Sequence, residues 1–276
     1  METKALLHTT HRYAPRSIQL VLVRANGPLF YSVAAASLLE ALAPVYAERV
    51  RHFFRGDRAF SEWMENEWLP RKAARAQALR QYVEKTWPEL DCAAAYEQCR
   101  AAVESDGGMG PHKPSAAHEA LARCVATVES GVFYRSLARW ADDPAMREMA
   151  AAMAQEEAVW FGHFRAAFER RARIQRFGVI STWRTVAACM RTGRDLHLAS
   201  AFRAISAQCG AQVPFPVIDY GEFLTRMRSV IERHGNLGTP QRILFRSWKG
   251  RARIARVEQP QQRAAGYFRP VLQAAA

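Results

Sequence analysis

The chain has 276 residues, of which 49% are hydrophobic and 24% are charged. This balance is typical of a globular protein with a substantial core and excludes an intrinsically disordered chain. Lys and Arg outnumber Asp and Glu by 39 to 26, so the formal net charge is +13. Because such a surplus attracts anions, we expect a negatively charged partner: a nucleic acid, an anionic membrane surface or an acidic protein.

The cysteines are scattered, their number is odd, and no two of them form a CxxC pair. This pattern argues against a zinc ribbon and against a disulfide framework, so a reducing compartment is the expected environment. The five positions are Cys92, Cys99, Cys124, Cys189 and Cys209.

The first part of the chain, residues 1–27, is expected to be irregular. It is basic at its start, but no cleavable apolar core with a small-residue site follows. Its apolar run 18–23 fits either a short strand or the beginning of a helix. The apolar stretch 28–47 is long enough to cross a bilayer, yet it contains Glu40 and Pro44, so we interpret it as a buried core helix. We therefore predict a cytoplasmic protein without a transmembrane segment.

The middle of the chain, residues 28–173, is dominated by helical patterns. Pro70 lies inside one of these patterns and should kink or restart that helix. The Asp-Asp-Pro sequence at 142–144 separates the last two long helices by so short a linker that they must pack antiparallel. The predicted long helices are 28–54, 58–86, 115–141 and 144–173, with a shorter one at 89–104.

The last part, residues 174–276, is predicted to be a basic helical extension. Pro-rich and Gly-rich segments separate its apolar stretches. The expected helices are 179–192, 197–209, 219–234 and 240–256. The last of them contains the Arg-rich sequence RILFRSWKGRARIAR at 242–256, a basic amphipathic segment that suits an anionic surface.

Four segments of the central part follow one another in a recognisable order. They are LLEALAPVY (38–46), WLPRKAARAQALRQYV (68–83), VESGVFYRSLA (128–138) and MAQEEAVWFGHF (153–164). Together they resemble the ferritin-like superfamily, most closely its soluble acyl-carrier-protein desaturase and related oxygenase branch. The resemblance implies an all-α fold, a ferritin-like four-helix bundle with a helical C-terminal extension. In such bundles two helices each provide one Glu and two provide a Glu-x-x-His pair, which together hold two metal ions.

The ligand positions that this resemblance implies are only partly kept. The positions that retain a carboxylate are Glu40, Glu129 and Glu157. In the second helix Lys72 stands where the resemblance implies Glu, and Arg75 stands where it implies His. In the fourth helix Trp160 stands where it implies His.

These replacements change what the site can bind. Lys72 and Arg75 are cations that repel a divalent metal, and the indole of Trp160 offers only an N–H donor. Charge-assisted hydrogen bonds from the two cations could instead hold the carboxylates in place. The hypothesis is that a salt-bridge cluster has replaced the metals, and no cofactor is expected.

Two alternatives remain open at this point. Pro70 could shift the phase of its helix so that Lys72 and Arg75 point outward, and the three Glu residues could lie on solvated faces. Alternatively, Glu156 and His163, which are seven residues apart and so share a helix face, could rescue a di-iron site in another register.

Three functions follow from these alternatives. The first is a non-catalytic ferritin-like protein that acts as a structural or regulatory partner of a related oxygenase, in a homodimer or in a heterodimer with a ferritin-like subunit. The second is an active di-iron oxygenase or desaturase that uses unusual ligands: Glu40, Glu129, Glu156, Glu157 and His163. The third is a binder of an acidic partner through segment 242–256. That partner would be an anionic membrane, a nucleic acid or the acyl carrier protein that the resemblance implies.

Overall fold

The computed structural model describes residues 13, 17–105, 115–175, 178–192, 195–209 and 213–235. Within these residues the chain is helical and contains no strand, so the all-α prediction is confirmed. Among the described residues, one isolated antiparallel β-bridge pairs the backbones of Leu90 and Cys209. The predicted helix 240–256, with its Arg-rich sequence, lies outside the described residues.

The helices of the first half of the chain are α2 (Leu20–Val23), α3 (Gly27–Ala41), α4 (Ala43–Phe53), α5 (Arg58–Trp63), the π-helical segment η1 (Met64–Trp68), α6 (Leu69–Thr86) and α7 (Cys92–Ser105). In this half, two of the predicted long helices are divided: one between α3 and α4, and one between α5 and α6. The helices of the second half are α8 (Ala116–Trp140), α9 (Pro144–Ile174), α10 (Val179–Thr192), α11 (Asp195–Gln208) and α12 (Tyr220–His234).

The prediction of one continuous helix over 28–54 is wrong. The helix ends at Ala41, and α4 continues from it after a bend of 42°. Pro44 lies in the first turn of α4. A proline has no N–H to donate to the preceding turn and its ring crowds that turn, which explains the break.

The predicted restart at Pro70 is present. Pro70 lies in the first turn of α6, and the residue before it, Leu69, still donates its N–H to the carbonyl of Met64 in the π-helical pattern. The segment η1 comes directly before it, so the chain winds more loosely for one turn between α5 and α6.

The turn between α8 and α9 is fixed by one buried carboxylate. Asp143 caps α9 by accepting a hydrogen bond from the N–H of Met146, at 3.3 Å. The same carboxylate accepts from the hydroxyl of Tyr82 at 2.9 Å and from the N–H of Gln19 at 3.1 Å. This residue therefore ties α6 and the beginning of α2 to the α8–α9 turn.

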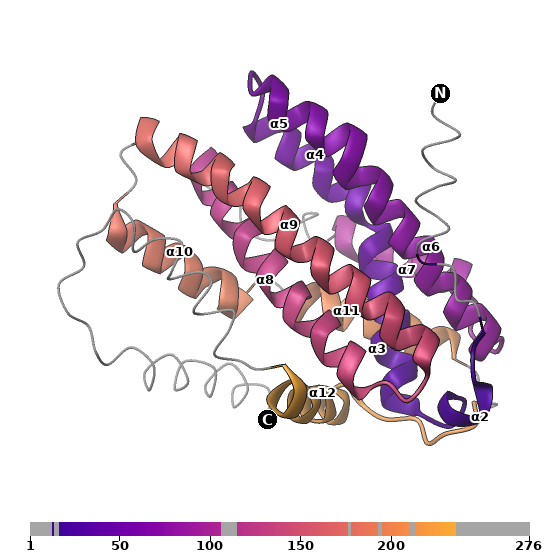
Figure 1. The fold of residues 1–276 in the computed structure, drawn as a ribbon. Helices are drawn as coiled ribbons and strands as arrows, with labels where there is room; N and C mark the ends of the chain where they lie inside the picture. Colours follow the sequence, from indigo (N-terminus) through magenta and orange to yellow (C-terminus); the bar gives the residue numbers. More distant parts are fainter. Residues whose placement is uncertain are drawn as a thin grey trace.

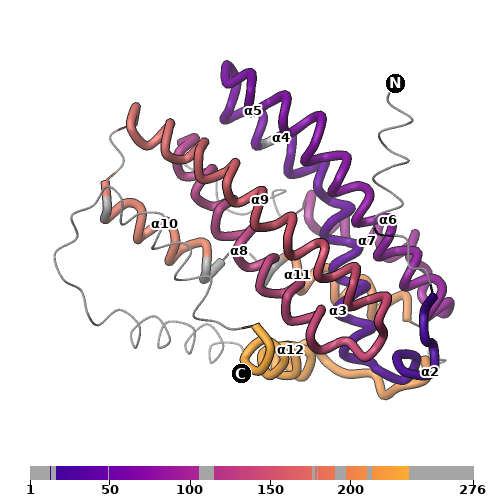
Figure 2. Tube along the Cα trace, in the orientation of Figure 1, coloured from indigo at the N-terminus to yellow at the C-terminus, as the bar shows by residue number. Residues whose placement is uncertain are grey.

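The helices form two closely packed pairs. Helices α8 and α9 run antiparallel along most of their length, and α3 packs against α6 (Figure 1). By contrast, α6 and α9 approach each other mainly through side chains. The trace in Figure 2 shows α12 lying across one end of α8, and α11 packs against α3 and α7. Helices from the predicted C-terminal extension therefore pack directly on helices of the central part.

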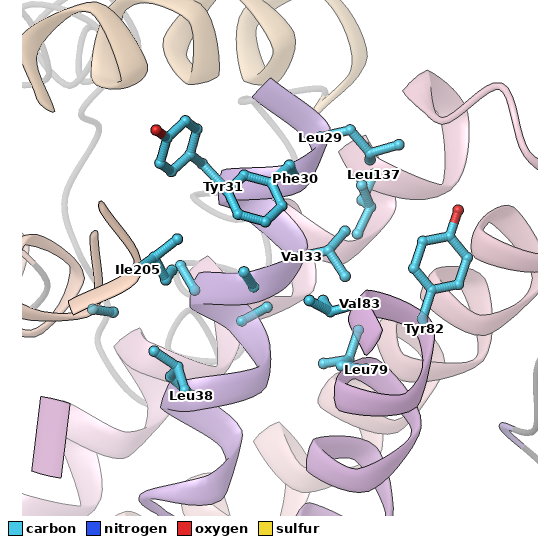
Figure 3. Packing of buried hydrophobic residues seen from close by; sticks show 14 of the residues in the cluster. Leu29, Phe30, Tyr31, Val33, Leu38, Leu79, Tyr82, Val83, Leu137 and Ile205 are labelled. Carbon is cyan, nitrogen blue, oxygen red and sulfur yellow. The ribbon is translucent and has the colours of Figure 1, made fainter. Parts of the chain in front are cut away.

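The main core surrounds α3. Figure 3 shows Val33 of α3 directed toward Leu79 and Val83 of α6, with Leu137 of α8 on the same side. Ile205 of α11 lies on the other side of α3. All five side chains are shielded almost completely from solvent. Because the apolar positions of α3 continue around its circumference, this helix is enclosed by its neighbours rather than facing water.

No single helix in the described ranges has both the length and the apolar character to cross a membrane. The bent pair α3 and α4 meets those criteria only when the two helices are taken together. Most of α3 is buried by other helices, as expected for a core helix.

The enclosure of α3 leads to a prediction about stability. Replacing Leu79 by Ala removes a fully buried side chain and leaves a cavity, so it should lower the free energy of unfolding by about 2–5 kcal/mol. The matched variant Leu22→Ala alters a side chain that is 43% exposed and should cost under ~1 kcal/mol. Urea denaturation followed by circular dichroism measures both. Equal losses would contradict this account of the core.

Candidate functional site

A single arginine occupies the space between α6 and α9. The side chain of Arg75, on α6, is fully buried. Its Nη1 lies 2.6 Å from Oε1 of Glu157 and its Nε lies 3.0 Å from Oε2 of Glu156. Its Nη2 donates to the backbone carbonyl of Met153 at 2.7 Å. One guanidinium thus contacts a full turn of α9, using the planar arrangement of donors that only arginine provides.

Lys72 connects this pair of helices to α3. It lies three residues before Arg75, a spacing that places both side chains on one face of α6. Its Nζ is 2.9 Å from Oε2 of Glu40 on α3 and 3.5 Å from Oε1 of Glu157. Arg75 also reaches Glu40, with 3.6 Å between Nη1 and Oε1. Glu40 is therefore held by two cations from α6.

Two further side chains complete what we call the ionic cluster. Arg71, one turn before Arg75 at the partly exposed edge, places its Nη1 3.1 Å from Oε1 of Glu156. The hydroxyl of Tyr134, on α8, donates to Oε1 of Glu40 at 2.6 Å. The ionic cluster comprises Glu40, Arg71, Lys72, Arg75, Tyr134, Glu156 and Glu157. Its three carboxylates are balanced by three cations.

Trp160 covers the cationic side of the cluster. Its ring centroid lies 3.9 Å from Cζ of Arg75 and 4.8 Å from Nζ of Lys72. Both distances are within the range of cation–π attraction, which is strongest for tryptophan and increases when the cation is shielded from water. The indole therefore supplies a favourable surface to two cations at a position where the resemblance implies a histidine.

The ionisation of the cluster follows from its geometry. Burial raises the pKa of Glu40, but Lys72 and Arg75 outweigh that effect and hold the pKa of this carboxyl below its usual value. Burial also raises the pKa of the Tyr134 hydroxyl, and the adjacent Glu40 carboxylate raises it further. The tyrosine therefore remains a donor while Glu40 remains an acceptor.

The structure places the sequence-predicted residues in different surroundings: some lie in the cluster, Glu129 lies beside it, and His163 lies at the surface. Lys72, Arg75 and Trp160 point inward and meet Glu40 and Glu157. Glu129 is half-buried on α8, where it lines a cavity beside Glu40, Lys72 and Glu157.

His163 and Glu156, the pair considered for a rescued metal site, do not face each other. His163 is exposed, and its ring stacks on that of Trp63 with centroids 4.3 Å apart and planes within 7° of parallel. Glu156 is buried and contacts Arg75 and Arg71.

Sequence reasoning missed Arg71, Tyr134 and the neighbouring Tyr13, and it considered Glu156 only as a metal ligand. Arg71 directly precedes Lys72, and Glu156 directly precedes Glu157, so a basic pair on one helix matches an acidic pair on the other. These matching pairs could have predicted from the sequence that the two helices face each other at this point. Tyr13, which is 1% exposed and lies beside Arg75 and Glu156, precedes every predicted helix and carried no such signal.

The residues present do not fit a di-metal centre. Such a centre needs carboxylates and histidines that converge on the metals. In this structure Glu40, Glu156 and Glu157 converge instead on the N–H donors of Lys72 and Arg75, which have no lone pair to offer a metal. Throughout the described residues, no group of three or more His, Cys, Asp or Glu side chains is arranged to hold a metal ion.

A cavity of about 310 Å³ adjoins the ionic cluster. Glu40, Lys72 and Glu157 form part of its wall, and residues of α3, α8, α11 and α12 form much of the rest. The cluster thus forms a polar part of the wall of a partly open cavity whose lining is otherwise mostly apolar.

Comparison of the chain with protein-family models, with curated proteins and with solved structures gives no match. The resemblance to the ferritin-like superfamily accordingly rests on the four sequence segments alone.

The burial of Arg75 predicts a large stability effect. Arg75→Met should lower the free energy of unfolding by about 3–5 kcal/mol, because it leaves buried carboxylates without their counter-charge. Arg80→Met, which breaks a half-exposed pair with Glu84 on the same helix, should cost under ~1 kcal/mol. Denaturant unfolding measures both. Adding Glu156→Gln and Glu157→Gln to Arg75→Met should restore part of the loss; no restoration would mean that packing, not charge, determines the effect.

The lowered pKa of Glu40 predicts a pH dependence. The unfolded chain titrates this group near pH ~4.3, and the folded pKa lies lower, so its stabilising effect is complete above that pH and disappears as the pH falls through the folded value. The stability difference between wild type and Glu40→Gln should be constant from neutral pH to about pH 5 and shrink below about pH 4.3. A difference that grows on acidification would contradict the charge state assigned to Glu40.

Proposed function

We propose that this protein is a ferritin-like four-helix bundle, formed by α3, α6, α8 and α9, in which the ionic cluster takes the place of a di-metal centre. In this proposal it is not a redox enzyme and needs no cofactor. It acts as a structural or regulatory partner of a related oxygenase, in a dimer with a ferritin-like subunit. The observation that carries the proposal is the fully buried guanidinium of Arg75 between Glu40, Glu156 and Glu157.

The positions of the charged residues support this reading. Glu40 and Glu157 keep their carboxylates on α3 and α9, while Lys72 and Arg75 on α6 provide positive charge between them. Metal ions would supply positive charge at the same place in a di-metal bundle. The replacement therefore preserves the sign of the charge that the carboxylates require, and it removes the groups that would bind iron.

The alternative of an active di-iron oxygenase lacks a corresponding observation. It requires His163 to join Glu156 at a metal, whereas His163 stacks on Trp63 at the surface. The alternative of an acidic partner bound through segment 242–256 concerns residues outside those described, so it stays a prediction from the sequence.

Metal analysis tests the proposal. Protein purified aerobically from iron-replete cells should contain iron far below one atom per chain and should show no oxidised di-iron absorption band. The restored variant, Lys72→Glu with Arg75→His and Trp160→His, should gain metal if it folds. Circular dichroism of both proteins provides the folding control. Two iron atoms per chain in the wild type would overturn the proposal, whatever the restored variant does.

A second measurement tests whether the stability of the fold depends on a bound metal. Treatment with a chelator should leave the midpoint of thermal unfolding unchanged, because the cations that hold the carboxylates are side chains of the protein itself. A drop in the midpoint that added iron reverses would contradict this reading.

A further inference from the structure

The cavity beside the ionic cluster is large enough for a small molecule. Its volume of about 310 Å³ lies at the lower end of the range of about 300–1,000 Å³ found for small-molecule pockets. At roughly 30 Å³ per water molecule it corresponds to about ten waters. A water in such a space needs two to four polar partners. Most of the wall is apolar, so waters in contact with that part of the wall find no partner in the protein there.

The apolar part of the wall comes mainly from α3, α8, α11 and α12. Large side chains that belong to different helices face the space from several directions, and small ones on α3 and α8 leave room for it. The large apolar residues on these helices are Leu39, Phe133, Leu198, Phe223, Met227 and Ile231, and Trp68 and Phe164 add to them from η1 and α9. A wall of this kind favours a molecule composed mainly of hydrocarbon.

The polar part of the wall does not favour a charged ligand. Lys72 is already within 2.9 Å of Glu40 and 3.5 Å of Glu157. An acid that paired with Lys72 would have to displace one of these carboxylates and leave it buried with less compensation. It would also lie close to Glu129, a third carboxylate in the wall. An organic cation would meet Lys72 and Arg123 in the same wall.

One hydrogen-bonding pair lies away from the cluster. The hydroxyl of Tyr46, on α4, is 3.3 Å from Nδ1 of His197, on α11, and both residues line the cavity. Burial raises the pKa of Tyr46, so this hydroxyl stays protonated. The pair can give a hydrogen bond to a neutral polar group and accept one from it.

We propose that this cavity binds one uncharged, mainly apolar small molecule that carries a single hydrogen-bonding group, of the chemical class of a medium-chain alcohol. The hydrocarbon part lies against the apolar wall, and the hydroxyl group bonds to the Tyr46–His197 pair. This inference rests on the proposed function in one respect, because it takes the carboxylates to be paired with Lys72 and Arg75 rather than with metal.

Binding of three ligands with the same chain length tests the charge requirement. The purified full-length protein is titrated with 1-octanol, with octanoate and with octylammonium by isothermal calorimetry at neutral pH. We expect 1-octanol to bind at least about tenfold more tightly than either charged ligand, which corresponds to about 1.4 kcal/mol. Octanoate or octylammonium binding as tightly as the alcohol would overturn the proposal, and so would the absence of alcohol binding.

Cavity-filling variants test the location. Ala36→Phe on α3 and Ala126→Phe on α8 add a ring at residues that line the cavity. Each should weaken 1-octanol binding by at least about tenfold. The matched control Ala166→Phe adds the same ring at an exposed position of α9 and should leave binding unchanged. Using two variants from different helices guards against the failure of one to fold, which circular dichroism would reveal. Unchanged binding in a folded filling variant would place the alcohol elsewhere and overturn the proposal.

Tyr46→Phe tests the polar end of the ligand. This variant keeps the ring and removes only the hydroxyl, so it should weaken 1-octanol binding while leaving the binding of n-octane unchanged. An equal effect on both ligands would contradict the assigned orientation. Iron content measured on the same preparations separates the two proposals: iron-free protein that binds no alcohol refutes only the cavity assignment, whereas iron-loaded protein refutes the proposed function.

Discussion

The guanidinium of Arg75 is shielded from water and must find all its hydrogen-bond partners within the protein. A charge in this position is tolerated only when opposite charges and good donor–acceptor geometry compensate for the lost solvent. The acidic pair on α9 and the carbonyl of Met153 meet this requirement directly, and Glu40 adds charge from α3. The arrangement of α3, α6 and α9 around this side chain therefore depends on one ion. Tyr134 and Trp160 limit the access of water to it from the remaining sides.

Much of this arrangement was accessible from the sequence, because the long helices have strong signals at both ends. The Asp-Asp-Pro sequence before α9 and the proline at the start of α6 marked boundaries that the structure shares. The break before α4 was missed, since a proline in an apolar helical pattern predicts either a kink or a restart and periodicity does not choose between them. The inward direction of Lys72 was inferred from position along the chain. That Glu156 is a direct partner of Arg75 depends on the rotation of α9, which the sequence leaves undetermined.

The same helices provide paired charges to the ionic cluster and mostly apolar side chains to the adjoining cavity. The cluster is satisfied internally, since each of its carboxylates faces a cation. For this reason it can form one wall of an apolar space without attracting an ion into it. A site with uncompensated carboxylates at the same place would recruit metal or water. The pairing of charges thus determines both what the bundle core excludes and what the cavity beside it is able to accept.

The long sequence separation within the cluster also affects the order in which the chain is made. Arg71 and Lys72 are 85 residues ahead of Glu156 and Glu157. While the protein is synthesised, the basic face of α6 emerges well before the acidic face of α9, and only Glu40 is available to it. Burying this face before α9 is present would leave its cations with too few partners, which is energetically costly. Complete pairing of this face therefore requires α9.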